Sequence, residues 1–109
     1  LRIAAVGLAV GPLDLRTGLD TALARVVAMF GAAQPHHAYL FTNRRANRLK
    51  VLVHDGFGVW LAVRRLHQGR FIWSSAGSGR LALSREQFDA LVLGLPWRAL
   101  CDGGVIRVL

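Results

Sequence analysis

Two polar turns divide the middle of the chain, and they constrain the fold more than any other feature of the sequence. Residues 38–43 and 48–54 have strand-like patterns and flank the tip "RRAN", and Asp55-Gly56 follows the second of them. Asp-Gly is typical of two-residue hairpin turns because glycine adopts the positive φ that such turns require. A third strand, from residue 57 to about 63, should therefore return beside the second. The middle of the chain thus predicts three antiparallel strands with tight connections.

An apolar run and a helical pattern precede these strands. Residues 3–10 are nearly all apolar and are typical of a buried strand, which Gly11-Pro12 ends. The segment "TGLDTALARVVAMFG" then repeats apolar residues at helical spacing, which predicts a helix that ends at its final glycine. Thr17 and Asp20 are spaced as a capping pair at its start.

The segment "LSREQFDALVLG" predicts a second helix with clear signals at both ends. Ser84 and Gln87 match a capping box, Leu83 and Phe88 match a hydrophobic staple, and the final glycine ends the helix. The β-α-β-β-β-α order predicts an α+β fold, in which an antiparallel sheet carries two helices packed on one face. With 109 residues, the whole chain (1–109) is expected to form a single small domain.

Positive charge is concentrated in one part of the chain. The protein has 14 Lys and Arg against six Asp and Glu, a net charge of +8. Residues 44–70 contain seven of these bases and a single acid, Asp55. Solubility does not require so local an excess, which favours an anionic partner such as nucleic acid, an anionic membrane surface or an acidic protein.

The hairpin tip and the strands beside it supply the candidate binding residues. Arginine donates paired hydrogen bonds to phosphate, and asparagine can bond phosphates or base edges while it shapes a turn. If the third strand pairs beside the second, Arg64, Arg65 and Arg70 extend the same positive region. Such a ribbon can lie along phosphates or enter a groove. The predicted nucleic-acid-binding residues are Asn43, Arg44, Arg45, Asn47, Arg48, Lys50, Arg64, Arg65 and Arg70. The alternative is a solvated turn without a ligand.

Signals of catalysis are weak. His36 and His37 lie in a loop with no cysteine or carboxylate at ligand spacing, and the one cysteine, Cys101, has no partner for a disulfide or a metal site. His54-Asp55 could serve a hydrolase, but Asp at a tight turn is explained by backbone geometry. We therefore expect no enzyme activity, no metal, no cofactor and no small-molecule substrate.

Aromatic residues alternate with the basic ones, which raises the alternative of base stacking. At strand spacing, however, Phe and Trp more often belong to the core. We predict that Trp60 and Phe71 are buried and that Trp97 packs against the second helix; for Trp73 both alternatives stay open.

Three segments of the chain resemble one protein family. They are "GPLDLRTGLDTALARVV", "AYLFTNRRANRLKVLVHDGFGVWLAVRRLHQGRFIW" and "LSREQFDALVLGLPW". In this order they resemble the small accessory protein TnpB, the second short reading frame of one large group of bacterial insertion sequences, which is distinct from the RNA-guided nuclease of the same name. The resemblance covers about residues 8–97 and leaves 98–109 as a tail. Leu15 stands where the family usually has Met, and Ser74 stands where it usually has Pro.

The resemblance implies a bacterial, cytoplasmic protein that assists transposition, while the transposase frame carries the acidic catalytic triad. The family's middle motif falls on residues 43–50, and a later motif falls on Arg64 and Arg65. Two functions stay open: binding DNA, or the transposase–DNA complex, through the basic β-hairpin, or docking an acidic transposase surface as a protein–protein adaptor. An edge strand could also pair two copies as a homodimer. No membrane partner is expected, and the longest apolar run is far shorter than the ~20 residues that a spanning helix needs.

Overall fold

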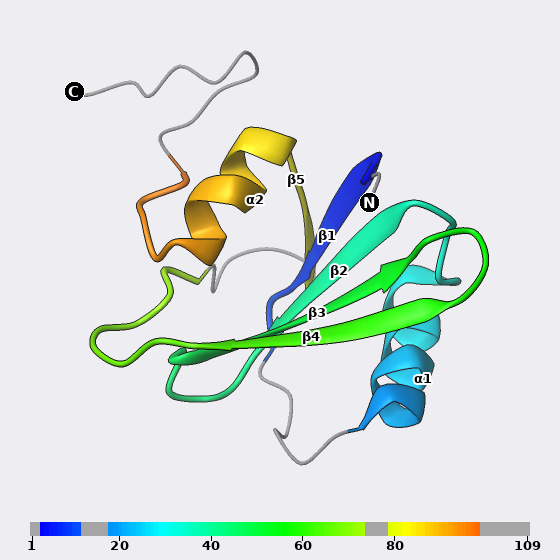
Figure 1. The fold of residues 1–109 in the computed structure, drawn as a ribbon, viewed down its shortest axis with the longest axis horizontal. Coiled ribbons are helices and arrows are strands. Elements are labelled where there is room, and N and C mark those ends of the chain that lie inside the picture. Colours follow the sequence, from blue (N-terminus) through cyan, green and yellow to red (C-terminus); the bar gives the residue numbers. More distant parts are fainter. Residues whose placement is uncertain (1–2, 12–17, 74–78, 99–109) are drawn as a thin grey trace.

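A five-stranded sheet with two helices makes up the part of the chain that the structure describes (Figure 1). The computed structural model describes residues 3–11, 18–73 and 79–98. Along the chain the elements are β1 (Ala5–Ala9), α1 (Leu19–Phe30), β2 (His37–Thr42), β3 (Arg48–His54), β4 (Val59–Arg65), β5 (Arg80–Leu83) and α2 (Arg85–Val92). The strands lie in the order β4-β3-β2-β1-β5. The predicted α+β class is confirmed.

The central three strands form the predicted antiparallel meander. β2 pairs with β3, and β3 pairs with β4 over its full length, from Arg48 opposite Arg65 to His54 opposite Val59. The tight turn lies one residue later than the sequence predicts, because Gly56, with φ of 93°, and Phe57 are its central residues. This shift sets which residues of β3 and β4 face each other.

The remainder of the sheet differs from the prediction of a purely antiparallel sheet. β1 pairs parallel with β2, because α1 carries the chain back to the same end of the sheet before β2 begins. β5 is an additional short strand that pairs antiparallel with the other side of β1. The sheet is therefore mixed, and β1 lies between β2 and β5.

The helices lie on opposite faces of the sheet, which corrects the prediction that both pack on one face. Leu40 belongs to the core cluster that contains Phe88 and Leu91 of α2, whereas its neighbour Phe41 belongs to the cluster that contains Val26 of α1. Successive residues of a strand point to opposite faces, so the two clusters lie on different sides of β2. Figure 1 shows α1 near β3 and β4, and α2 beside β1 and β5.

The helix ends explain where each helix begins and stops. α2 has the predicted capping box: the Ser84 hydroxyl accepts from the N–H of Gln87 (3.1 Å), whose side chain accepts from the N–H of Ser84 (2.9 Å). Its other end closes at Gly94, where two backbone bonds return to Ala90 and Leu91 as in a Schellman motif. α1 begins after Gly18, which supplies no side-chain cap; Thr17, the predicted cap, lies outside the described residues, as do Cys101 and the tail from residue 99.

The predicted burial of the aromatic residues is confirmed for Phe71 and Trp97 but not for Trp60. Phe71 and Trp97 are buried in the α2-side cluster, as predicted, and the Trp97 indole donates to the carbonyl of Ile72 (2.6 Å). Trp73 is half-buried and donates to the carbonyl of Ala9 (2.9 Å). The prediction for Trp60 was wrong, because this side chain is 60% exposed. β4 is an edge strand, and α2 packs on β1 and β5 near the opposite edge of the sheet, too far away to cover Trp60.

Candidate nucleic-acid interface

Asn43 organises the turn between β2 and β3. Its Oδ1 accepts hydrogen bonds from the backbone N–H groups of Asn47 and Arg48, both at 3.0 Å, and its Nδ2 donates to Oδ1 of Asn47 at 2.6 Å. The turn passes through Ala46 with a positive φ of 56°, an uncommon conformation for a residue other than glycine. Asn43 is 9% exposed and both ends of its amide group are bonded within the turn, so its main role is to shape the turn.

The segment after β4 holds this turn in place. The N–H of Leu66 donates to the carbonyl of Asn47 (2.9 Å), and the N–H of Phe71 donates to the carbonyl of Ala46 (2.6 Å). Phe71 also inserts its ring into the core, which anchors the segment. The β2–β3 turn and the residues that leave β4 therefore form one unit at one end of the sheet.

This unit gathers eight of the nine predicted binding residues, and we call the six arginines among them the arginine end. Its members are Arg44, Arg45, Arg48, Arg64, Arg65 and Arg70. All of them are exposed except Arg48, which is half-buried. Within the described chain, none of their side chains has a carboxylate partner. His67 is exposed in the same segment, between two of these arginines, and is missing from the predicted set although its place in the sequence could have indicated it.

Three of the arginines surround a cleft. Arg45, Arg48 and Arg65 line a hollow of about 290 Å³ together with Asn43 and Asn47. Arg48 and Arg65 stand directly opposite each other on β3 and β4. Like charges directly opposite on adjacent strands destabilise a sheet. The fold therefore concentrates positive charge here at an electrostatic cost, which a bound anion would offset.

Lys50 lies apart from the arginines. It is 5% exposed and faces the α1 side of the sheet opposite Phe41, so its ammonium group has little access to an external ligand. Arg64 is exposed on the other face, opposite Leu49. The structure thus brings the arginines of the predicted set to one end, but it places Lys50 and Asn43 inside.

A larger cleft, about 430 Å³, lies elsewhere, beside α1 and over β1 and β5. Its floor is made of small residues, including Ala5, Gly7 and Ala82. Its cationic side chain is Arg80, which donates to the carbonyl of Met29 (2.8 Å) near the end of α1. Volume alone favours this cleft, but the clustered charge that can bind an anion lies at the arginine end.

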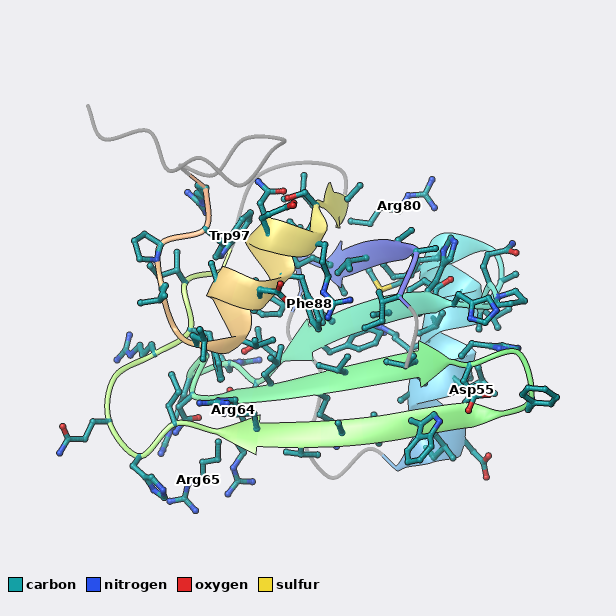
Figure 2. All side chains as sticks on the ribbon, turned by 45° about the horizontal axis from the view of Figure 1, so that its top comes forward. Asp55, Arg64, Arg65, Arg80, Phe88 and Trp97 are labelled. Carbon is teal, nitrogen blue, oxygen red and sulfur yellow. The ribbon has the colours of Figure 1, made fainter. Side chains whose placement is uncertain are left out.

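The acidic residue of the basic stretch lies at the opposite end of the β3–β4 hairpin. Figure 2 shows Asp55 far from Arg64 and Arg65. A hydrogen bond from the Trp60 indole (2.7 Å), with further bonds from the N–H groups of Phe57 and Gly58 (both 2.8 Å), lowers the pKa of Asp55 from 3.8 to about 2. His54 accepts the N–H of Gly56 through Nδ1 (3.0 Å). His54 and Asp55 therefore both accept backbone hydrogen bonds within the β3–β4 turn.

The lowered pKa of Asp55 predicts a pH dependence of stability. Because its folded pKa lies below the unfolded value, the stabilisation is complete above about pH 4 and is lost as the pH falls toward about 2. We expect the melting temperature of the wild type to drop more across this range than that of Asp55→Asn, which cannot titrate. Thermal unfolding followed by circular dichroism at several pH values checks this, and equal losses in both proteins would contradict it.

Within residues 3–11, 18–73 and 79–98, no three His, Cys, Asp or Glu side chains come together as metal ligands would. Neither helix in these ranges has the length and apolarity needed to cross a bilayer. The arginine end remains the candidate site.

Comparisons with known proteins agree with the resemblance in the sequence. The chain is 35% identical over 94 residues to the uncharacterized protein y4hO of Sinorhizobium fredii, a match that covers 85% of this chain and 82% of the relative. It is 34% identical over 91 residues to the uncharacterized protein y4jC of the same organism, a match that covers 79% of this chain and 74% of that relative. No solved structure matches it. The family model described as "IS66 Orf2 like protein" matches residues 4–102. This chain therefore belongs to the IS66 Orf2-like family, whose members are accessory proteins of insertion-sequence transposition.

Proposed function

We propose that the protein binds DNA, alone or within a transposase–DNA complex, through the phosphate backbone and by means of the arginine end. The observation that carries this proposal is the opposition of Arg48 and Arg65 beside Arg45, around one cleft and without a carboxylate partner in the described chain. The protein would act in the cytoplasm and contribute no catalytic step.

Arginine suits this role because its planar guanidinium donates two parallel hydrogen bonds to phosphate oxygens. The cleft between Arg45, Arg48 and Arg65 can receive one phosphate, while Arg44, Arg64 and Arg70 extend the positive surface along the backbone. Phosphate contacts position a protein on DNA without reading its sequence. We therefore expect similar affinity for related and unrelated duplexes. Asn43 and Lys50 are excluded from the proposed contacts because their side chains are buried.

The test is fluorescence anisotropy with two duplexes, the terminal inverted repeat of the element and a shuffled sequence, at several salt concentrations. The logarithm of the binding constant should fall linearly with the logarithm of salt, by about 0.9 per phosphate contacted. The triple variant Arg45→Ala, Arg48→Ala, Arg65→Ala should lower that slope by roughly 2 to 3 units.

A matched control removes the same charge from other surfaces. Arg25, Arg85 and Arg98 are exposed outside the arginine end, so their triple alanine variant has the same net charge as the test variant. It should retain most of the slope. Equal losses in the two variants would mean that only net charge matters, and this would overturn the assignment of the site. If neither duplex binds at low salt, the DNA proposal fails. Binding of the transposase without DNA would then favour the adaptor function.

A further inference from the structure

β4 is an open edge of the sheet. It is seven residues long and outermost in the strand order, and no strand of the described chain lies on its free side. Trp60 and Val63 are 60% and 58% exposed on its two faces. A long edge strand with exposed apolar side chains is a ready template for pairing with another strand.

The backbone of β4 shows which groups are available for such pairing. The N–H of Asp55 donates to the carbonyl of Gly58 (3.0 Å), and the N–H of Leu66 donates to the carbonyl of Asn47 (2.9 Å). Gly58 and Leu66 therefore direct their backbone groups toward β3. In an antiparallel pair this direction alternates from one residue to the next. The residues that direct their N–H and C=O groups to the open side are Val59, Leu61, Val63 and Arg65.

We propose that β4 pairs antiparallel with β4 of a second copy of this chain, with Ala62 opposite Ala62 on the two-fold axis. In this register Val59 lies opposite Arg65 of the second copy, and Leu61 lies opposite Val63. All four outward-facing residues then take part in ladder hydrogen bonds. Sliding the strands by two residues in either direction leaves one of the four without a partner, so this register makes the most bonds.

The side chains on the α2 face favour the same register. Trp60 lies opposite Arg64 of the second copy, in a pair that is not joined by ladder bonds and whose side chains are therefore close. A guanidinium over an indole is a favourable cation–π contact. The indole also donates to Oδ2 of Asp55, so a carboxylate lies next to the incoming arginine.

Charge complementarity is what selects a second copy as the partner. Asp55 lies in the turn that precedes β4, and Arg64 and Arg65 lie at the other end of the strand, as Figure 2 shows. Antiparallel pairing brings the acidic end of each copy to the basic end of the other. It also keeps the arginines of the two copies apart, although each copy has a net charge of +8.

Disulfide trapping tests the register. In a Cys101→Ser background, Ala62→Cys places two thiols across the two-fold axis, where Cα atoms of a non-hydrogen-bonded pair lie about 4.5 Å apart, within disulfide range. Mild oxidation should give a product of twice 11.9 kDa. The control is Arg64→Cys, exposed on the same face two residues away, which lies opposite Trp60 and should cross-link at least about tenfold more slowly. Faster trapping at residue 64 than at residue 62 would overturn the register.

Sedimentation equilibrium without DNA tests the dimer itself, independently of the proposed function. The wild type should show a concentration-dependent dimer, and Val63→Lys should weaken it at least about tenfold, because a charge on an edge strand opposes pairing. The matched control is Val27→Lys, a similarly exposed valine on α1, which should leave the dimer intact. Circular dichroism confirms that both variants fold. A wild type that stays monomeric at all concentrations, or that is dimeric and unaffected by Val63→Lys, would refute the proposal.

Discussion

Replacing Phe41 by alanine should lower the free energy of unfolding by about 3–5 kcal/mol. Phe41 is 1% exposed and lies in the cluster on the α1 face of the sheet, with Val26 of α1 and Leu52 of β3. Truncating its ring leaves a cavity between the helix and the sheet, because neighbours on a paired strand cannot move far to fill it. Since a domain of this size is stabilised by only about 5–15 kcal/mol, a large part of its stability should be lost.

Urea denaturation followed by circular dichroism measures this loss. Phe57→Ala serves as the control, because Phe57 belongs to the same residue type but is fully exposed in the β3–β4 turn. It should change the free energy of unfolding by less than about 0.5 kcal/mol. A loss below about 1 kcal/mol for Phe41→Ala would mean that α1 is not held by this cluster.

Asn43→Ala should lower the free energy of unfolding by about 1–3 kcal/mol and also weaken DNA binding. The substitution removes the acceptor of two backbone N–H groups, those of Asn47 and Arg48, in a turn that is partly shielded from water. Buried donors without acceptors carry the full cost of desolvation. The turn that positions Arg45 and Arg48 around the cleft would then lose its fixed geometry, so the loss of binding should accompany the loss of stability.

The control is Asn47→Ala in the same turn. It removes only the side-chain bond between Nδ2 of Asn43 and Oδ1 of Asn47, and it leaves both backbone donors satisfied. Its effect on the free energy of unfolding should be about half that of Asn43→Ala or less, because one side-chain donor loses its acceptor instead of two backbone N–H groups. Denaturation and anisotropy are measured on both variants, and equal effects of the two substitutions would show that the acceptor of Asn43 is not what maintains the turn.

The local elements of the fold could be predicted from the sequence, and its long-range pairings could not. Alternating polarity and the Ser84–Gln87 box identify strands and a helix start because they depend on neighbouring residues. The parallel pairing of β1 with β2 depends on where α1 returns the chain. β5 has four residues and lies directly before α2, so it is too short to give a strand pattern that can be told apart from the start of the helix. Trp60 was misplaced for the same reason: a strand has the same alternation at the edge of a sheet as at its centre.

The register of β3 against β4 limited how much of the candidate site could be predicted from the sequence. A turn centred on Asp55-Gly56 would have placed Arg48 opposite Val63. With Gly56 and Phe57 at the centre, Arg48 lies opposite Arg65. In the observed turn, the Asp55 carboxylate accepts hydrogen bonds from the N–H groups of Phe57 and Gly58. The charge of the arginine end was therefore evident in the sequence, but the opposed pair that marks the cleft depends on a shift of one residue in the turn.

The two backbone bonds that hold the β2–β3 turn to the segment after β4 also affect the entropy of binding. Because Asn47 and Ala46 are already hydrogen-bonded to Leu66 and Phe71, the main chain beneath the arginines has less conformational freedom to lose than an unsupported loop. An anion that bound there would then restrict mainly the side chains, at about 0.5–1.5 kcal/mol for each one immobilised. A loop that became ordered on binding would lose a further 1–2 kcal/mol for each residue fixed. The arginines of this protein are thus held by a rigid turn that is preorganised before any ligand arrives.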